Sequence, residues 1–262
     1  MSYVIAIANQ KGGVAKTTTA VGLSGALVQE GYDVLAIDLD AQANLTIALG
    51  INPLQVRRSI ADIFVNAEKL ASVIQATNLP GLELIPANKD MELSERFVPL
   101  RQNYEILLRQ QLSFPEISSV YDFIVLDCPP YLGAITTNAL VAAQMLIIPT
   151  QAEAFSLNAL KNMIAQVKII RQTFNPALTY RILITLRDLR NRIHRTMSEQ
   201  LVNAFPTGIL NTSIDLDTKL RESAIAGLPV TYCYPKSRGA QQYRSLAMEI
   251  LEYVRQKNLI PA

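Results

Sequence analysis

Residues 10–19 decide the fold, and they read Gln10-Lys11-Gly12-Gly13-Val14-Ala15-Lys16-Thr17-Thr18-Thr19. An apolar run precedes this glycine-containing stretch and a helical pattern follows it, so the sequence predicts a strand, a turn and a helix. Such a turn directs several backbone N–H groups and the positive end of the helix dipole at one point, where a polyphosphate can bind. The alternative is an ordinary glycine-rich turn, but the flanking strand and helix are the context that a phosphate-binding loop (P-loop) requires.

The polar residues of the loop are of the types that phosphate and Mg²⁺ need. Lys16 is expected to neutralise the β- and γ-phosphates of a nucleotide, and Thr17 to bind Mg²⁺ through its hydroxyl. The general motif has glycine directly before the lysine, where this chain has Ala15. Alanine restricts the backbone of the loop more than glycine does. We still expect nucleotide binding to survive, while the sequence leaves the effect on the hydrolysis rate open.

Carboxylates end two further apolar runs and are candidates for metal binding and catalysis. Asp38 and Asp40 lie at the end of the second predicted strand, and Asp127 ends the fourth. The carboxyl ends of parallel strands form the binding edge of such a sheet, and Mg²⁺ takes oxygen ligands while keeping several waters. Asp127 is therefore suited to a magnesium-bound water, and one of the pair can face the metal while the other approaches the γ-phosphate. The alternative is that Asp38 and Asp40 only cap a helix at Asn44–Leu49.

Short apolar runs alternate with longer amphipathic stretches along most of the chain. This alternation predicts an α/β fold with a doubly wound, mostly parallel twisted sheet and helices on both faces. No repeat or flexible linker interrupts it, so we expect a single P-loop ATPase domain over residues 1–262. The strands are expected at Tyr3–Ala8, Val34–Asp38, Leu82–Pro86, Phe123–Asp127, Met145–Pro149, Arg181–Thr185 and Gly208–Leu210. The helices are expected at Thr17–Glu30, Ile60–Phe64, Lys69–Gln75, Tyr104–Leu112, Asn138–Ala143, Ser156–Phe174, Arg195–Phe205, Lys219–Ala226 and Gly239–Lys257.

Composition excludes several classes of protein. Half of the 262 residues are hydrophobic and 18% are charged, which is not the composition of a disordered chain. Two cysteines and one histidine are too few for a disulfide framework or a zinc site. We find no apolar run of ~18 residues and no secretory signal, so we expect a cytoplasmic protein. The net charge of +2 means that any contact with DNA must come from a local patch.

Several segments together resemble one known family. Lys11–Thr18 resembles the deviant Walker A box of the ParA/MinD ATPases, whose additional lysine corresponds to Lys11. The chain departs from the family pattern at Ala15 and Ala43, which replace glycine, at Ala41, which replaces proline, and over residues 211–215, where many relatives carry an Ile-Pro-Arg strand end. Further segments are similar to the ParA (Soj-like) branch, and they are Asp38–Thr46, Leu79–Asn88, Tyr121–Gly133, Pro149–Glu153, Gly227–Val230 and Pro235–Tyr243.

This resemblance implies an ATPase that forms a sandwich dimer on binding Mg·ATP. Lys11 would reach the nucleotide of the second subunit, Lys16 would act on its own subunit's nucleotide, and Asp40 would position the hydrolytic water. Asp38 and Asp127 are then better placed for the metal, through water, together with Thr17. The expected nucleotide-binding residues are Lys11, Gly12, Gly13, Val14, Ala15, Lys16, Thr17 and Thr18.

The resemblance also implies non-specific DNA binding by surface cations. For each cation the simpler interpretation is a solvated helix face. The implied cycle is that of a nucleoid-associated ATPase, released when an adaptor or ParB-type partner stimulates hydrolysis, that positions a plasmid, a chromosome origin or a protein assembly such as the carboxysome (a McdA-like role). The candidate DNA contacts are Arg187, Lys219, Arg221, Arg238 and Arg244, with Arg190, Arg192 and Arg195 beside the first of them.

Two other classes remain as alternatives. A MinD-like membrane-associated ATPase would need a basic amphipathic C-terminal helix. The segment Leu251–Ala262 has two basic residues, a glutamate and a proline, so we expect no stable membrane association. An electron-donating reductase of the same superfamily would need a pair of cluster-binding cysteines, but Cys128 and Cys233 have no such context and are expected to be buried thiols.

Overall fold

A computed structural model describes residues 2–153, 156–188 and 190–257. Within these ranges eight strands form one sheet in the order β3-β4-β2-β5-β1-β6-β7-β8. All neighbouring strands are parallel except β3 and β4. The predicted doubly wound, mostly parallel α/β sheet is thus confirmed. The strands are β1 (Tyr3–Ile7), β2 (Val34–Asp38), β3 (Gln75–Ala76), β4 (Leu82–Ile85), β5 (Phe123–Asp127), β6 (Met145–Gln151), β7 (Thr179–Arg187) and β8 (Ile209–Asp215).

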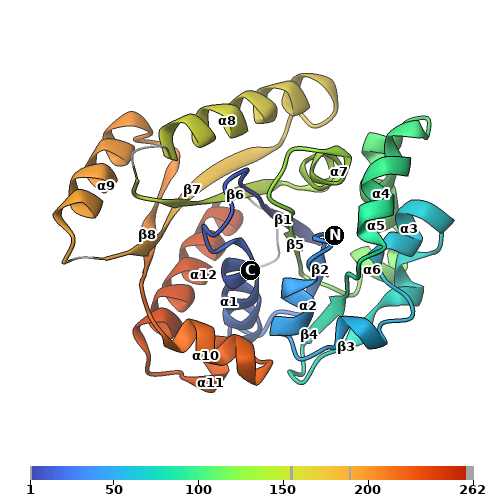
Figure 1. Cartoon of the computed structure of the whole chain (residues 1–262), viewed down its shortest axis with the longest axis horizontal. Coiled ribbons are helices and arrows are strands. Elements are labelled where there is room, and N and C mark those ends of the chain that lie inside the picture. Colours follow the sequence, from blue (N-terminus) through green and yellow to red (C-terminus); the bar gives the residue numbers. More distant parts are fainter. Residues whose placement is uncertain (1, 154–155, 189, 258–262) are drawn as a thin grey trace.

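Helices cover both faces of the sheet, and Figure 1 shows α7 and α8 on one side of it and α1 and α12 on the other. Side chains alternate between the faces, so Val4 and Ala6 of β1 join the core beneath α7 and α8, whereas Ile5 and Ile7 join the core beneath α1 and α12. Burial on both faces explains why the central strands are almost wholly apolar.

The helices of the first core are α3 (Ile60–Asn66), α4 (Met91–Phe97), α5 (Leu107–Leu112), α6 (Pro115–Ser118), α7 (Ala134–Ala142), α8 (Ser156–Thr173) and α9 (Arg192–Ala204). Those of the second are α1 (Lys16–Gln29), α2 (Asn44–Ala48), α10 (Lys219–Ala226), α11 (Val230–Cys233) and α12 (Arg238–Gln256). Short 3₁₀ turns lie at Pro53–Gln55, Leu70–Val73, Val98–Leu100 and Tyr104–Ile106. No helix in the described part of the chain is long and apolar enough to span a bilayer.

Three expected elements differ from the structure. The helix expected at Lys69–Gln75 is a 3₁₀ turn followed by β3, because only Leu70 and Val73 are buried and the chain then pairs with β4. Strand β8 runs five residues beyond Leu210, to Asp215, through polar residues that an apolar pattern does not reveal. Helix α7 begins four residues before Asn138, at Ala134, where a carboxylate from a distant helix binds its first N–H groups.

The carboxyl ends of the three central strands meet at one edge of the sheet. Asp127 of β5 is in register with Ile7 of β1 and with Asp38 of β2. The loop after β1 therefore lies directly beside both aspartates. The parallel register brings together residues that are 89 positions apart in sequence, since Asp38 and Asp127 end adjacent strands.

Candidate nucleotide site

The loop between β1 and α1 has the open backbone that a phosphate site requires. Gly13 and Ala15 adopt left-handed conformations with φ of 73° and 64°. Ala15 precedes the first residue of α1, and no side chain caps that helix end. Unlike most helix ends, the N-terminus of α1 thus keeps its first-turn N–H groups available for an anion.

Buried side chains attach this loop to the strands beside it. The side-chain amide of Asn9 donates to the carbonyl of Pro149 in β6 (2.7 Å), and its carbonyl oxygen accepts from the backbone N–H of Lys11 (3.0 Å). The hydroxyl of Thr185 in β7 donates to the carbonyl of Val14 (3.0 Å). The side chains of Asn9 and Thr185 have little access to water, so these three hydrogen bonds hold the loop in one position.

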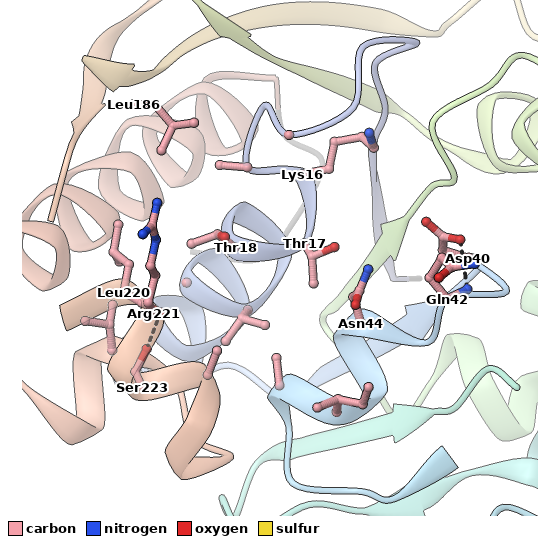
Figure 2. A pocket seen from close by; sticks show the side chains of 18 of the residues that line it. Lys16, Thr17, Thr18, Asp40, Gln42, Asn44, Leu186, Leu220, Arg221 and Ser223 are labelled. Carbon is pink, nitrogen blue, oxygen red and sulfur yellow. Dashed lines mark hydrogen bonds between the residues drawn. The ribbon is translucent and has the colours of Figure 1, made fainter. Parts of the chain in front are cut away.

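A cavity of about 570 Å³ lies against the loop. In Figure 2 Lys16, Thr17 and Thr18 occupy its middle, with Asp40 and Gln42 on one side and Leu186 and Arg221 on the other. Of the predicted nucleotide-binding residues, Lys11 and Val14 do not line it, since Val14 is buried beneath the loop. Those that do line it are Gly12, Gly13, Ala15, Lys16, Thr17 and Thr18.

Asp127 is buried at the end of β5 with an exposed fraction of 1%. Neither of its carboxylate oxygens accepts a hydrogen bond of ordinary geometry from the described residues. Burial, and next the neighbouring Asp38 carboxylate, raise the pKa of Asp127 well above its usual range, although the nearby Thr17 hydroxyl and Lys16 ammonium oppose this. A buried carboxylate without a partner is costly unless a cation is bound. Hydroxyl and carboxylate oxygens are the ligands that Mg²⁺ takes, so Thr17 and Asp127 fit this ion.

Asp38 and Asp40 have different surroundings. Asp38 is fully buried, and its carboxylate accepts from the N–H of Asp40 (3.1 Å) and from the N–H and hydroxyl of Thr46 (2.8 and 2.7 Å). Burial raises the pKa of Asp38 to about 6, while these hydrogen bonds act in the opposite direction. Asp38 thus makes the capping contact of the alternative interpretation, at the start of α2. Asp40 lines the cavity, and one of its oxygens accepts from the N–H of Gln42 (3.0 Å).

The two loop lysines make contacts within their own chain. The ammonium of Lys16 is buried and donates to the carbonyl of Lys11 (3.2 Å). Burial lowers the pKa of Lys16, although the carboxylates of Asp127 and Asp40 act in the opposite direction. The ammonium of Lys11 forms an ion pair with Glu153, two residues after the end of β6. Glu153 belongs to a segment that the resemblance included, but the sequence assigned it no role.

Most of the basic residues predicted to contact DNA have partners within the chain. Arg187 pairs with the buried carboxylate of Asp215 (2.7 Å), and Lys219 pairs with Glu222 (2.6 Å). Arg238 donates to the carbonyl of Leu216 and Arg244 to that of Pro235, both at 2.6 Å. Arg221 lines the nucleotide cavity.

Of the two cysteines expected to be buried thiols, Cys128 is buried, whereas Cys233 is only half-buried.

Comparisons with known proteins agree with this geometry. Residues 2–180 match the family model described as an AAA domain. The chain is 35% identical over 251 residues to the sporulation initiation inhibitor protein Soj of Bacillus subtilis, covering 95% of this chain and 98% of that protein. It is 33% identical over 255 residues to the chromosome partitioning protein ParA of Caulobacter vibrioides, covering 97% and 96%.

Solved structures show the same fold. A cobyrinic acid a,c-diamide synthase from Mycobacterium smegmatis, with bound ADP and magnesium, is similar at a TM-score of 0.86 and 30% identity, covering 100% of this chain and 99% of that one. Apo McdA from Cyanothece is similar at a TM-score of 0.83, covering 95% and 100%, but at 21% identity this likeness shows the fold alone.

Proposed function

Because the chain belongs to the AAA-domain family of ParA- and Soj-type ATPases, we propose that it dimerises on Mg·ATP, binds nucleoid DNA without sequence preference, and leaves DNA when a partner stimulates hydrolysis. One observation carries the proposal. The buried carboxylate of Asp127 accepts no hydrogen bond of ordinary geometry from the part of the chain that the structure describes, and it lies near Lys16, Thr17 and Asp40, which line the cavity. Groups of these types can hold a cation, a polyphosphate and an oriented water together.

Different residues of the site have different roles in phosphoryl transfer. The N–H groups of the loop and the ammonium of Lys16 hold the phosphates and offset their charge. Thr17 and, through water, Asp127 would hold Mg²⁺, which would supply positive charge to offset that of the phosphates. Asp40 has one oxygen on Gln42, and its other oxygen orients the attacking water. Asp38 contributes by holding the backbone of Asp40 and the start of α2. Positioning of this kind accounts for most of the catalysis of phosphoryl transfer.

The cargo is inferred from the relatives. The similarity to proteins named for chromosome partitioning and for sporulation control favours a chromosomal cargo and a ParB-type partner. The likeness to McdA, at 21% identity, concerns the fold alone and does not by itself favour a carboxysome role. The DNA contacts stay a proposal. Arg187, Lys219 and Arg238 keep exposed fractions of 28%, 42% and 55% beside their carboxylate partners, so phosphates can still reach them.

A membrane-bound alternative is less compatible with the fold. Its C-terminal helix would have to place an apolar face in the bilayer interface. The apolar face of α12 is buried against the sheet through Tyr243, Leu246, Ile250 and Val254. Of the C-terminal segment Leu251–Ala262, residues 258–262 lie outside the described residues.

The experiment measures mass and DNA binding in parallel. We expect light scattering to give a monomer without nucleotide and a dimer with Mg·ATP, and only the dimer to bind unrelated duplexes with similar affinity. That affinity should fall steeply between ~50 and ~200 mM salt, as counterion release requires. Lys16→Ala is the control that should lose nucleotide binding and both later steps. The same mass in both states, or a strong preference for one DNA sequence, would contradict the proposal.

A further inference from the structure

Glu95 makes a contact that neither the P-loop nor the metal site explains. It lies in α4 and is half-buried. One carboxylate oxygen accepts from the backbone N–H of Ala134 (2.6 Å), and the other accepts from that of Ile135 (3.2 Å). These are the first two residues of α7, and both are buried. A charged acceptor at a helix N-terminus is favoured both by hydrogen bonding and by the helix dipole.

Helix α7 has no cap of its own. Its N-cap position is Gly133, and no side chain from that position binds the helix end. A Cβ atom at Gly133 would lie 1.7 Å from a carboxylate oxygen of Glu95, so any side chain there would displace the glutamate. The backbone of Gly133 is otherwise ordinary, with φ of −105° and ψ of −162°, a conformation that serine also adopts at N-caps. Glycine is therefore required by Glu95 and not by backbone strain.

The segment fixed by this contact begins at the metal site. Residues 128–133 connect Asp127, at the end of β5, to the start of α7. Pro130 in this segment lines the nucleotide cavity. The hydroxyl of Thr136, in the first turn of α7, donates to the carbonyl of Tyr131 (2.7 Å). Burial, then the carboxylates of Glu95 and Asp40, raise the pKa of Tyr131 to about 12.

Glu95 itself is carried by a helix, α4, that is anchored in the core. Met91, Ser94 and Val98 of α4 and the following turn are buried in the core. A carboxylate on such a helix can transmit its position to the segment after Asp127. We propose that Glu95 is a positioning residue for ATP hydrolysis, because it joins α4 to the N-terminus of α7 and so holds residues 128–133 against the nucleotide cavity. This inference rests on the proposed use of that cavity for ATP.

The first measurement is the effect of Glu95→Ala on Mg·ATP hydrolysis. Loss of the cap loosens the first turn of α7 and with it the wall of the cavity, while the P-loop remains intact. We expect kcat to fall by roughly tenfold, in the range that a small misplacement of reacting groups produces, and KM to change by less than threefold. Glu95→Gln keeps one acceptor and should retain part of the rate. Glu92→Ala removes an exposed carboxylate from the same helix and should behave like the parent.

A second variant separates positioning from simple helix capping. Glu95→Ala removes the closest obstacle to a side chain at position 133 and leaves a ring carbon of Tyr131 at 3.2 Å from the added Cβ. Gly133→Ser in that background then supplies a local N-cap, if the Tyr131 ring gives by a few tenths of an ångström, without restoring the link to α4. We expect the double variant to regain the parent's melting temperature but not its kcat. Recovery of both would show that Glu95 is only a helix cap and would overturn the inference, as would an unchanged kcat in Glu95→Ala.

The parent protein and Asp40→Ala are measured in the same assay. Should Glu95→Ala fail to fold, Glu95→Gln and the double variant still decide the question, because each keeps a cap on α7. If the parent hydrolyses ATP and Asp40→Ala does not, the proposed function stands, and an unexpected result for the Glu95 variants contradicts only the role of Glu95. Absence of hydrolysis in the parent would instead refute the proposed function.

Discussion

Asp127 is a buried acid. We expect its charge to destabilise the protein without nucleotide and to be offset when Mg·ATP binds. Its pKa is raised, so the folded protein holds its proton more tightly than the unfolded chain does. The cost of ionisation is absent below the unfolded pKa of ~3.9 and grows as the pH rises toward the folded pKa. The free protein should therefore lose stability from this residue as the pH rises from about 4 to neutrality.

Asp127→Asn should remove that cost. Without nucleotide we expect the variant to be more stable than the parent at pH 7.5, and by a smaller margin at pH 5, because less of the cost of ionising the buried carboxylate is present at the lower pH. The further stabilisation by Mg·ATP should disappear. Urea unfolding at both pH values measures the effect, with Glu68→Gln, an exposed carboxylate, as the control. Equal stability of Asp127→Asn and the parent at pH 7.5 would mean that groups of the protein, such as the Lys16 ammonium, already offset the charge without a metal ion.

Asp40 should affect hydrolysis and leave binding intact. Its side chain lines the cavity and has one oxygen on the N–H of Gln42, so it can orient water without holding the metal. Asp40→Ala should bind ATP and Mg²⁺ as the parent does, hydrolyse ATP more slowly by about 10²-fold or more, and accumulate as the DNA-binding dimer. Partner-stimulated phosphate release and light scattering test this. Asp33→Ala, at the opposite end of β2, is the matched control, and a parental rate in Asp40→Ala would end the assignment.

At the scale of the element, the starts of α1 and α2 share one feature. Ala15 and Ala43 precede these helices with φ of 64° and 52°, in the left-handed region. These are the two positions at which this chain has alanine where the resembled family has glycine. The sequence indicated that Ala15 restricts the loop, but only the structure shows that both alanines occupy a conformation costing an L-residue ~1 kcal/mol.

Ala15→Gly should relieve this strain in the P-loop. The gain in stability will be small, at most about 0.5 kcal/mol, because glycine also gains freedom in the unfolded chain. A loop that no longer holds a strained alanine at the cavity wall should hydrolyse ATP up to about fivefold faster, which corresponds to ~1 kcal/mol. Ala67→Gly, at another left-handed position with φ of 56° at the end of α3, should match the stability change and leave hydrolysis unaltered. An equal change in rate for both variants would refute a local effect.

At the scale of the whole molecule, we expect the ion pair between Lys11 and Glu153 to oppose the proposed dimerisation. The resemblance assigns Lys11 to the nucleotide of a second subunit, whereas here its ammonium is bound to Glu153 of its own chain. In the proposed dimer, Lys11 would have to leave this pair to reach the second nucleotide. Both side chains are partly exposed, at 29% and 43%, so the pair is worth at most about 1 kcal/mol.

Glu153→Gln should let the ATP-bound dimer form at a lower protein concentration, by roughly two- to fivefold, since 1 kcal/mol corresponds to about a factor of five. Sedimentation across a concentration series measures the midpoint. Glu222→Gln breaks a pair of similar exposure, with Lys219, and should leave the midpoint unchanged. A higher midpoint for Glu153→Gln would place Glu153 in the dimer interface itself.

The sequence by itself determined the features that depend on neighbours in the chain. The strand, loop and helix around Lys16, the buried central strands and the carboxylates at their ends follow from local pattern, and parallel pairing then requires Asp38 and Asp127 to lie side by side. Only the tertiary structure decided which partner each polar group has. Lys11 meets Glu153 across 142 positions, and Glu95 meets Ala134 across 39. Such contacts depend on how helices pack on the sheet, and no local preference of either residue encodes that packing.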